Sequence, residues 1–232
     1  MTAAWNSFYR QFVTYNGYKS VLNGLLTTVE IAILGLAIGI LIGTLIAVVK
    51  VMPKRGFLSR LLEGICNVYV AFFRGTPMVV QLLIGYFVLM PALGLVADGI
   101  TVAIAIFGLN SGAYVSEIMR SGIQSVDAGQ LEAGRAVGLP YRTAMLKIVI
   151  PQSIKNILPT LGNEFIVLVK ETSIVSFIAV TDVTKAFRAI GDANYEYIIP
   201  YLMLALVYLV IVMLITLGIR FMERRFKRSD RT

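Results

Sequence analysis

The stretch from Ile31 to Val49, IAILGLAIGILIGTLIAVV, decides the fold class because it contains no charged residue. A helix that crosses the hydrocarbon core of a bilayer needs about 20 mostly apolar residues. Further uncharged runs occupy residues 75–97, 100–116 and 197–219. The chain is 57% hydrophobic and only 15% charged, with a mean hydropathy of +0.79. These features predict an all-α polytopic membrane protein.

Five membrane-spanning helices are expected. Their approximate bounds are Leu22 to Val49, Phe57 to Met90, Ile100 to Met119, Asn156 to Val180 and Tyr197 to Phe221. The second helix is expected to break near residues 75–77, because Pro77 has no backbone N–H and Gly75 is conformationally permissive. In the first helix, glycines recur at every fourth position and predict a face where another helix approaches closely. They are Gly35, Gly39 and Gly43.

The chain is expected to divide into an N-terminal segment, a membrane domain and a tail. Residues 1–18 are predicted to form an amphipathic helix in the bilayer interface, because four aromatic residues share one helical face. They are Trp5, Phe8, Tyr9 and Phe12. No basic region followed by an apolar run marks a cleaved signal peptide here. Residues 19–225 are expected to form the membrane domain, with a cytoplasmic loop at 125–151, and residues 226–232 a basic tail.

Basic residues predict the orientation in the membrane. Most of the 21 Lys and Arg residues lie in three segments, at 50–60, 120–155 and 220–232. These segments share one side of the membrane if residues 57–90 cross it once. The positive-inside rule then places the N-terminus outside and the C-terminus in the cytoplasm. The net charge of +8 therefore follows from topology, and no nucleic-acid partner is expected.

The sequence excludes several kinds of chemistry. It contains no His, which removes imidazole metal ligands and Ser-His-Asp catalysis, and its single cysteine, Cys66, cannot form an intrachain disulfide. It also lacks the phosphate-binding loop pattern G-x-x-x-x-G-K-[ST]. No catalytic residue, metal site or bound cofactor is expected in this chain.

A helix–turn–helix is predicted on the inner face of the membrane within residues 125–151. Asp127 resembles a helix N-cap with Gln130 as its reciprocal partner, and a short helix is expected from Ala128 to Val137. Gly138 suits the left-handed position that ends a helix. Pro140 can then begin a second short helix as its first residue, and Pro151 closes or kinks that helix. By itself, this segment is equally compatible with an amphipathic loop resting on lipid headgroups.

The spacing within residues 132–151 resembles the EAA loop of permease subunits of bacterial ABC importers. That pattern is Glu-Ala-Ala, three residues, Gly, nine residues, then Ile-x-Leu-Pro. Here it is carried by Glu132, Ala133, Gly138, Ile148 and Pro151. The sequence departs from it at two positions, where Gly134 replaces the second Ala and Ile150 replaces Leu.

Three further segments resemble signatures of the polar amino acid branch of that family. They are Phe73 to Pro77 with Gln81-Leu82, Asn110 to Tyr114 with Glu117 and Arg120, and Gly162 to Glu164 with Lys170 to Ser173. The resemblance covers roughly residues 20–225. It implies a dimeric permease with the type I importer fold, located in the bacterial inner membrane. It also implies an ATPase subunit on each EAA loop, which binds ATP and Mg²⁺, and an extracytoplasmic binding protein that delivers the amino acid.

The ATPase is expected to dock on a smooth helix within the loop, because small residues there fit a partner's groove. The predicted docking residues are Gln130, Glu132, Ala133, Gly134, Val137, Gly138, Leu139 and Arg142.

Substrate is expected to meet polar groups inside the spans, since ionisable residues there are costly and indicate function. Arg74, beside the predicted break, can meet a carboxylate, or it can pair structurally with Glu164 or Glu171. Glu164 suits an ammonium group or a cationic side chain. The predicted substrate-binding residues are Arg74, Gly75, Thr76, Gln81, Asn110, Asn163, Glu164, Lys170, Thr172 and Ser173.

Three functions are compatible with these features. The first is the permease of an ATP-driven importer of polar amino acids. The second is a secondary amino acid transporter driven by an ion gradient, although no internal repeat is visible. The third is a membrane scaffold, which the charged residues at 74 and 164 argue against. The sequence leaves open whether the dimer contains one kind of chain or two, and which amino acid is carried.

Overall fold

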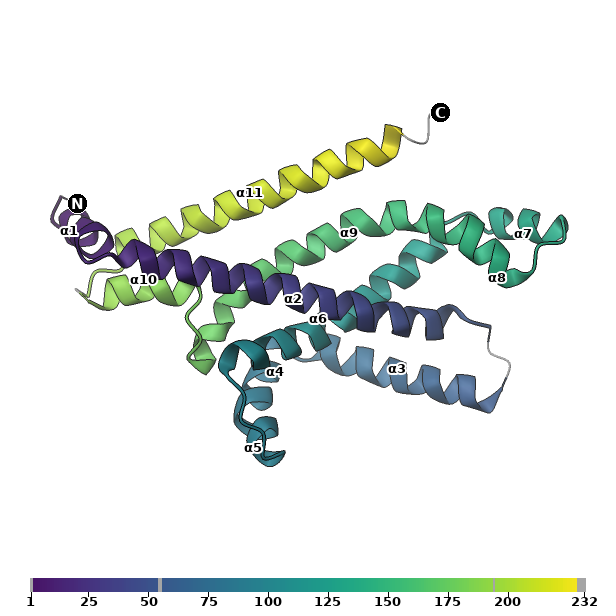
Figure 1. The fold of residues 1–232 in the computed structure, drawn as a ribbon, viewed down its shortest axis with the longest axis horizontal. Coiled ribbons are helices and arrows are strands. Elements are labelled where there is room, and N and C mark those ends of the chain that lie inside the picture. The colour runs from purple at the N-terminus through teal and green to yellow at the C-terminus, as the bar shows by residue number, and fades with distance from the viewer. Residues whose placement is uncertain (1, 54–55, 194, 229–232) are drawn as a thin grey trace.

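The computed structural model describes residues 2–53, 56–193 and 195–228, and within them every regular element is helical (Figure 1). The N-terminal half contains α1 (Thr2–Tyr9), the π turn η1 (Arg10–Thr14), α2 (Gly17–Val51), α3 (Phe57–Gly75), α4 (Met78–Ile84), the π turn η2 (Gly85–Leu89), α5 (Met90–Ala92) and α6 (Gly99–Gln124). The C-terminal half contains α7 (Ala128–Ala136), α8 (Tyr141–Ala144), the π turn η3 (Met145–Val149), α9 (Ile150–Glu171), the 3₁₀ helix η4 (Thr172–Ile178), α10 (Val183–Asp192) and α11 (Ile198–Arg228).

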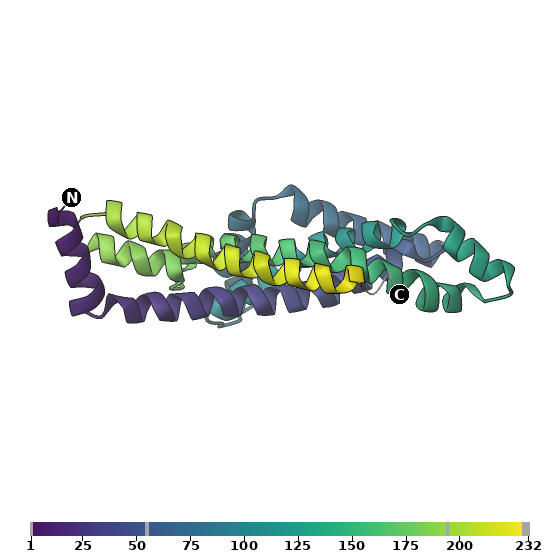
Figure 2. The ribbon, with the colours of Figure 1, turned by 90° about the horizontal axis from the view of Figure 1, so that it is seen from above.

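The helices form an elongated bundle with different elements at its two ends. Helix α1 lies across one end, and α7 and α8 form the other (Figure 2). The end of α2, the start of α3 and the C-terminal end of α11 also lie toward the α7–α8 end (Figure 1). The three basic segments therefore gather at one end, as the positive-inside argument requires. Residues 54–55 and 229–232, parts of the predicted basic loop and tail, lie outside the described residues.

Three helices are long and apolar enough to cross a membrane: α2, α6 and residues 198–224 of α11. The pair formed by Phe57–Gly75 and Met78–Ala92 is long and apolar enough only when taken together, and it is bent by 106° at the predicted break, which fits a broken span or a re-entrant loop. Helix α9 has a suitable length of 22 residues but is interrupted by charged residues such as Glu164 and Lys170. The count of five spans is compatible with this arrangement and stays a prediction.

The second predicted span is broken where expected, and after the break the chain stays helical from Met78 to Ala92 with the π turn η2 in its middle. The fourth predicted span differs from the observed helix. The fourth begins earlier, at Ile150, and its regular α-helix ends at Glu171 rather than Val180. It continues as η4, which ends at Ala179 in the left-handed conformation with φ +63°.

The predicted glycine face of α2 packs directly on α6. A methyl group added at Gly35 would lie 3.0 Å from the Phe107 Cβ atom, and one added at Gly39 would lie 2.6 Å from the Ser111 Oγ atom. At Gly43 it would lie 2.7 Å from Val115. The two helices therefore approach as closely as their backbones allow, which is the use of small residues between membrane helices.

Pro151 does not close its helix, so the first of the two alternatives offered by the sequence is wrong. The chain passes from α8 through η3 into α9, with Pro151 in the first turn of α9. Pro91 follows η2 in the same way. Because a wider π turn precedes each proline, the carbonyl that the ring would strike can move aside and the helix continues. Pro140 is the N-cap of α8 rather than its first residue.

Helix α10 was not anticipated from the sequence. Its N-cap Asp182 is fully buried, and the carboxylate accepts hydrogen bonds at 2.9 Å from the backbone N–H groups of Thr184 and Lys185. A methyl group added at Gly24 of α2 would lie 2.5 Å from the Asp182 carbonyl oxygen. Helix α10 thus connects α2 with α11, and its apolar face is buried between them.

The N-terminal aromatic face is divided between protein and surroundings. Phe8 is buried against the α10 cluster, and Phe12 stacks on Phe187 with ring centroids 6.4 Å apart. Trp5 and Tyr9 remain about half exposed. Part of the face that was expected to lie in the bilayer interface therefore packs against the protein.

Candidate functional site: a polar cavity and a coupling segment

A cavity of about 550 Å³ opens beside the break between α3 and α4. Its walls come from the break itself, from α6, from α9 and from the start of η4. They are formed by Thr76, Pro77, Met78, Val79, Asn110, Tyr114, Glu164, Val167, Leu168, Glu171 and Ile174. Residues from all three signature segments named in the sequence analysis therefore line this one cavity.

Two amide side chains hold the broken helix against α6. The Gln81 Nε2 group donates to the carbonyl oxygen of Phe73 at 2.9 Å and to the Thr76 hydroxyl at 2.8 Å. Its Oε1 atom accepts a hydrogen bond of 2.8 Å from Asn110 Nδ2. A helix end leaves carbonyls without intrahelical donors, and these amides satisfy them. Gln81 itself does not line the cavity, but it is hydrogen-bonded to Thr76 and Asn110, which do.

Glu164 lies on the cavity wall with only 8% of its surface exposed. Its Oε1 atom accepts a hydrogen bond of 3.1 Å from the Ser111 hydroxyl. Glu171 lines the same cavity, and none of the described lining residues is basic. Two carboxyl groups facing one membrane cavity favour a positively charged ligand group.

Arg74 lies at the edge of this arrangement. Its guanidinium carbon is 5.3 Å from the centre of the Tyr114 ring, a cation–π contact, and Tyr114 lines the cavity. Among the described residues Arg74 forms no ion pair with Glu164 or Glu171. The guanidinium group is exposed and retains donors for a further partner.

Several predicted substrate residues lie away from the cavity wall. Asn163 and Lys170 are exposed on other faces of α9. Gly75 is also exposed, and no atom lies within 4 Å of a methyl group added there. Thr172 is fully buried and its hydroxyl donates to the Val169 carbonyl oxygen at 2.7 Å. Ser173 is half-buried and is not among the lining residues.

Tyr114, Glu171 and Ser111 were missed as site residues. Tyr114 follows Asn110 by four positions, and Glu171 follows Glu164 by seven, so each pair shares a helical face. This periodicity was the available signal. The contact between Ser111 and Glu164 joins different helices and has no local signature.

The predicted helix–turn–helix at residues 125–151 is confirmed, and we call it the coupling segment. Asp127 caps α7 by accepting a hydrogen bond of 2.7 Å from the Gly129 N–H. The helix ends with Gly138 at φ +89°. The Gly138 N–H donates to the Arg135 carbonyl and the Leu139 N–H to the Gly134 carbonyl, at 3.0 and 3.1 Å. This is a Schellman motif, whose left-handed residue is favoured to be glycine.

The predicted docking residues divide into exposed and internal groups. Glu132, Ala133, Val137 and Gly138 are exposed. Gly134 is buried inside the segment, where an added methyl group would lie 2.7 Å from Ile148 Cδ1.

The other three have different surroundings. Leu139 is half-buried. The Gln130 side chain accepts a hydrogen bond of 3.4 Å from Gln152, rather than serving as reciprocal partner of Asp127. Arg142 is exposed and lines an apolar groove together with the end of α2.

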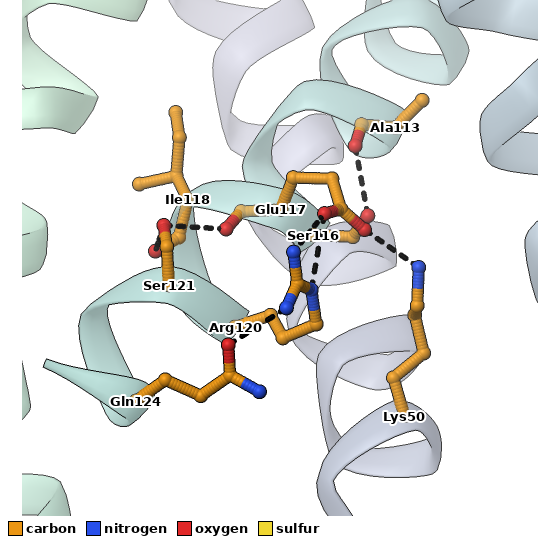
Figure 3. Close-up of polar contacts among 8 residues, drawn as sticks. All are labelled: Lys50, Ala113, Ser116, Glu117, Ile118, Arg120, Ser121 and Gln124. Carbon is orange, nitrogen blue, oxygen red and sulfur yellow. Dashed lines mark hydrogen bonds and ion pairs between the residues drawn. The ribbon is translucent and has the colours of Figure 1, made fainter.

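An ionic cluster joins α6 to the C-terminal end of α2 (Figure 3). The Glu117 carboxylate accepts from Lys50 Nζ at 2.6 Å and from Arg120 at 2.7 and 3.0 Å. Arg120 also donates to Gln124 at 2.7 Å. Glu117 and Arg120 pair across one turn of α6, whereas Lys50 reaches Glu117 from α2. The cluster fixes the C-terminal ends of α2 and α6 to each other.

Comparison with known proteins identifies the family. Residues 35–228 match the model described as binding-protein-dependent transport system inner membrane component. The chain belongs to this family. The permease is 39% identical to the arginine transport system permease protein ArtQ of Bacillus subtilis, over 90% of this chain and 94% of that protein. It is 37% identical to the putative glutamine transport system permease protein GlnP of Rickettsia bellii, over 88% and 92%.

The permease also resembles a solved structure described as the crystal structure of an amino acid ABC transporter with histidines. The identity is 37%, the TM-score is 0.84, and the match covers 94% of this chain and 98% of that one. The chain is therefore a membrane-spanning permease subunit of an ABC importer, with the type I importer fold. This membership disfavours the ion-driven transporter and the scaffold.

Proposed function

We propose that this permease carries a polar amino acid through the cavity beside the α3–α4 break. The observation that carries the proposal is the pair of carboxyl groups, Glu164 and Glu171, on one cavity wall. They suit the α-ammonium group or a cationic side chain, and Arg74 suits the carboxylate. The similarity to ArtQ, named as an arginine transport system permease protein, and to GlnP, named as a putative glutamine transport system permease protein, supports the substrate class.

The proposal assigns ATP hydrolysis to a partner. An ATPase subunit that binds ATP and Mg²⁺ docks on the exposed face of the coupling segment, with Glu132 and Val137 at its centre. An extracytoplasmic binding protein delivers the amino acid at the opposite end, and a second permease subunit, of the same or a related chain, completes the pathway. The N-terminus then lies outside and the C-terminus in the cytoplasm. Closure of two ATPase subunits moves the coupling segments together and switches the cavity from inward-open to outward-open.

Uptake by the reconstituted importer tests the substrate site. The permease, its ATPase and its binding protein would be placed in lipid vesicles with labelled arginine, lysine, glutamine or cystine. Glu164→Gln is expected to lower uptake of the transported amino acid at least about tenfold, because a charged hydrogen-bond partner contributes about 1.5–3 kcal/mol.

Glu30→Gln is the matched control, since it removes the same charge from an exposed position on α2. Its uptake is expected to equal that of the wild type. Full uptake by Glu164→Gln, with ATP hydrolysis still stimulated by the loaded binding protein, would remove Glu164 from the substrate site.

A further inference from the structure

The break between α3 and α4 leaves a backbone carbonyl that needs a donor from elsewhere. In a continuous helix the Phe73 carbonyl would accept from the N–H of residue 77, but Pro77 has no N–H. The Gln81 Nε2 group donates to this carbonyl at 2.9 Å, and the Asn110 Nδ2 group donates to it at 3.2 Å. Gln81 is 5% exposed and Asn110 is 8% exposed. Two buried amides, one from α4 and one from α6, therefore replace the donor that the proline lacks.

These contacts decide which way each amide faces. A carbonyl oxygen can only accept a hydrogen bond, so the end of Gln81 that meets the carbonyls of Phe73 and Thr76, at 2.9 and 3.0 Å, must be its NH₂ group. The Gln81 oxygen then faces Asn110, which donates to it at 2.8 Å. Both N–H bonds of the Asn110 amide are thus used within the protein. Neither amide can turn over without bringing its own oxygen against a carbonyl oxygen.

The oxygen of Asn110 is left for the cavity. Among the described residues, no donor reaches the Asn110 Oδ1 atom. This atom is not enclosed by protein either, because Glu196 Oε2 is the one described side-chain atom that is buried without a partner. Asn110 lines the polar cavity, together with Glu164 and Glu171. The cavity wall therefore carries a neutral hydrogen-bond acceptor of fixed direction in addition to its two carboxyl groups.

We propose that Asn110 is a specificity-determining residue that accepts a hydrogen bond from an N–H group of the transported amino acid, and that Gln81 is the positioning residue that holds the Asn110 amide in this orientation. The inference rests on the proposed function, since it concerns the same cavity. It adds a requirement that charge alone does not impose. Carboxyl groups attract any cation, whereas a fixed amide oxygen selects a ligand that offers an N–H donor in one direction. Gln81 acts through Asn110, because Gln81 itself does not line the cavity.

Binding of labelled amino acids to the permease–ATPase complex tests the acceptor role. The complex would be placed in lipid nanodiscs without nucleotide and without the binding protein, and its Kd measured for labelled arginine, lysine and glutamine. Because the binding protein is left out, the Kd reports the permease cavity alone. Asn110→Ala removes the acceptor and is expected to raise the Kd about fivefold, which corresponds to about 1 kcal/mol.

Gln81→Met tests the positioning role, because it keeps the length of the side chain and removes both N–H donors. It is expected to raise the Kd about as much as Asn110→Ala does. The double variant should bind no more weakly than Asn110→Ala, since Gln81 acts through Asn110. A merely structural Gln81 would instead weaken binding by the same factor in both backgrounds. The matched control Gln11→Met removes an amide from a half-buried position on η1, outside the cavity, and should leave the Kd unchanged.

The outcomes distinguish this inference from the proposed function. If Glu164→Gln weakens binding while Asn110→Ala binds like the wild type, the cavity is the substrate site and the inference is wrong. Asn110→Ala decides this point even if Gln81→Met does not fold. If the effects of Gln81→Met and Asn110→Ala multiply in the double variant, Gln81 is not a positioning residue. If the wild type binds none of the three amino acids, or Glu164→Gln binds them like the wild type, the proposed function fails and the inference fails with it.

Discussion

Of the two membrane-crossing helices α6 and α11, the more apolar one, α11, is the less buried. In α6, 61% of the membrane-crossing stretch is buried, although it contains Asn110, Ser111 and Ser116. In α11, a more apolar stretch has no buried residue. In water the opposite relation would hold. In a bilayer, lipid solvates apolar side chains as well as a protein core does, so small and polar residues mark the packed interface.

The packed interface of α6 is built on reciprocal small residues. Methyl groups added at Gly108 and Gly112 would lie 2.5 and 2.8 Å from Ile38 and Ile42 of α2, and the glycines of α2 meet α6 in return. By contrast, nothing lies within 4 Å of a methyl group added at Gly218 of α11. The apolar surface of α11 is thus available to lipid or to the second permease subunit.

Gly39→Leu, in the packed interface between α2 and α6, should lower the stability of the protein most. The new side chain would collide with Ser111 and force α2 away from α6, costing more than the 1–3 kcal/mol of ordinary overpacking. We expect little folded protein and a large drop in the midpoint of thermal unfolding in detergent. The matched control is Gly218→Leu, which should unfold like the wild type. An equal loss in both variants would mean that α11 is as tightly packed in the assembled permease as α6.

Glu117→Gln tests the ionic cluster that joins the C-terminal ends of α2 and α6. The variant weakens the hydrogen bonds from Lys50 and Arg120 to a carboxylate that is only 19% exposed (Figure 3). We expect a loss of about 1–3 kcal/mol in stability, measured by thermal unfolding in detergent. Arg188→Gln removes the exposed pair with Asp192, at 3.8 Å, and should change stability by less than about 1 kcal/mol. Similar losses in the two variants would argue that the cluster contributes no more than a surface pair.

Gly138→Val tests a glycine that is required by backbone conformation instead of by close packing. Nothing lies near its missing side chain, but its φ of +89° strains any L-residue by about 1–2 kcal/mol. We expect a small loss of stability together with a clear loss of ATP-driven uptake, because the coupling segment loses its shape. In the control Gly134→Ala, the flexible end of Ile148 can move aside, and uptake should stay close to the wild type. If Gly138→Val kept full ATP-driven uptake, the left-handed turn at Gly138 would not be required for coupling to ATP hydrolysis.

Replacing Asp182, the N-cap of α10, is expected to have the smallest effect on stability of these substitutions. Burial raises the pKa of this carboxyl above its ordinary value. The folded state therefore binds a proton at pH values where the unfolded state has lost it, and stability from this group falls as pH rises through that interval. Asp182→Asn keeps an N-cap but cannot titrate, so its unfolding midpoint should fall less with rising pH in the acid range. Identical slopes for the two proteins would show that Asp182 does not contribute.

The sequence by itself determined what depends on neighbours along the chain. The uncharged runs gave the membrane class, Gly75 and Pro77 gave the break before α4, and Gly138 gave the left-handed turn of the coupling segment. The spacing of Gly35, Gly39 and Gly43 also predicted a close helix contact. Each of these features follows from the backbone preference of one residue or from the period of a helix.

Only the tertiary structure decided which distant residues meet. Lys50 reaches Glu117 across 67 positions, and Ser111 reaches Glu164 across 53. The sequence pattern proposed Asn163, Glu164 and Lys170 for the cavity, but the rotation of α9 turns only Glu164 of these three toward it, together with Glu171. A helical period fixes which residues share a face, whereas the direction of that face is set by packing against the other helices. That packing depends on contacts between residues far apart in the chain, which no local pattern records.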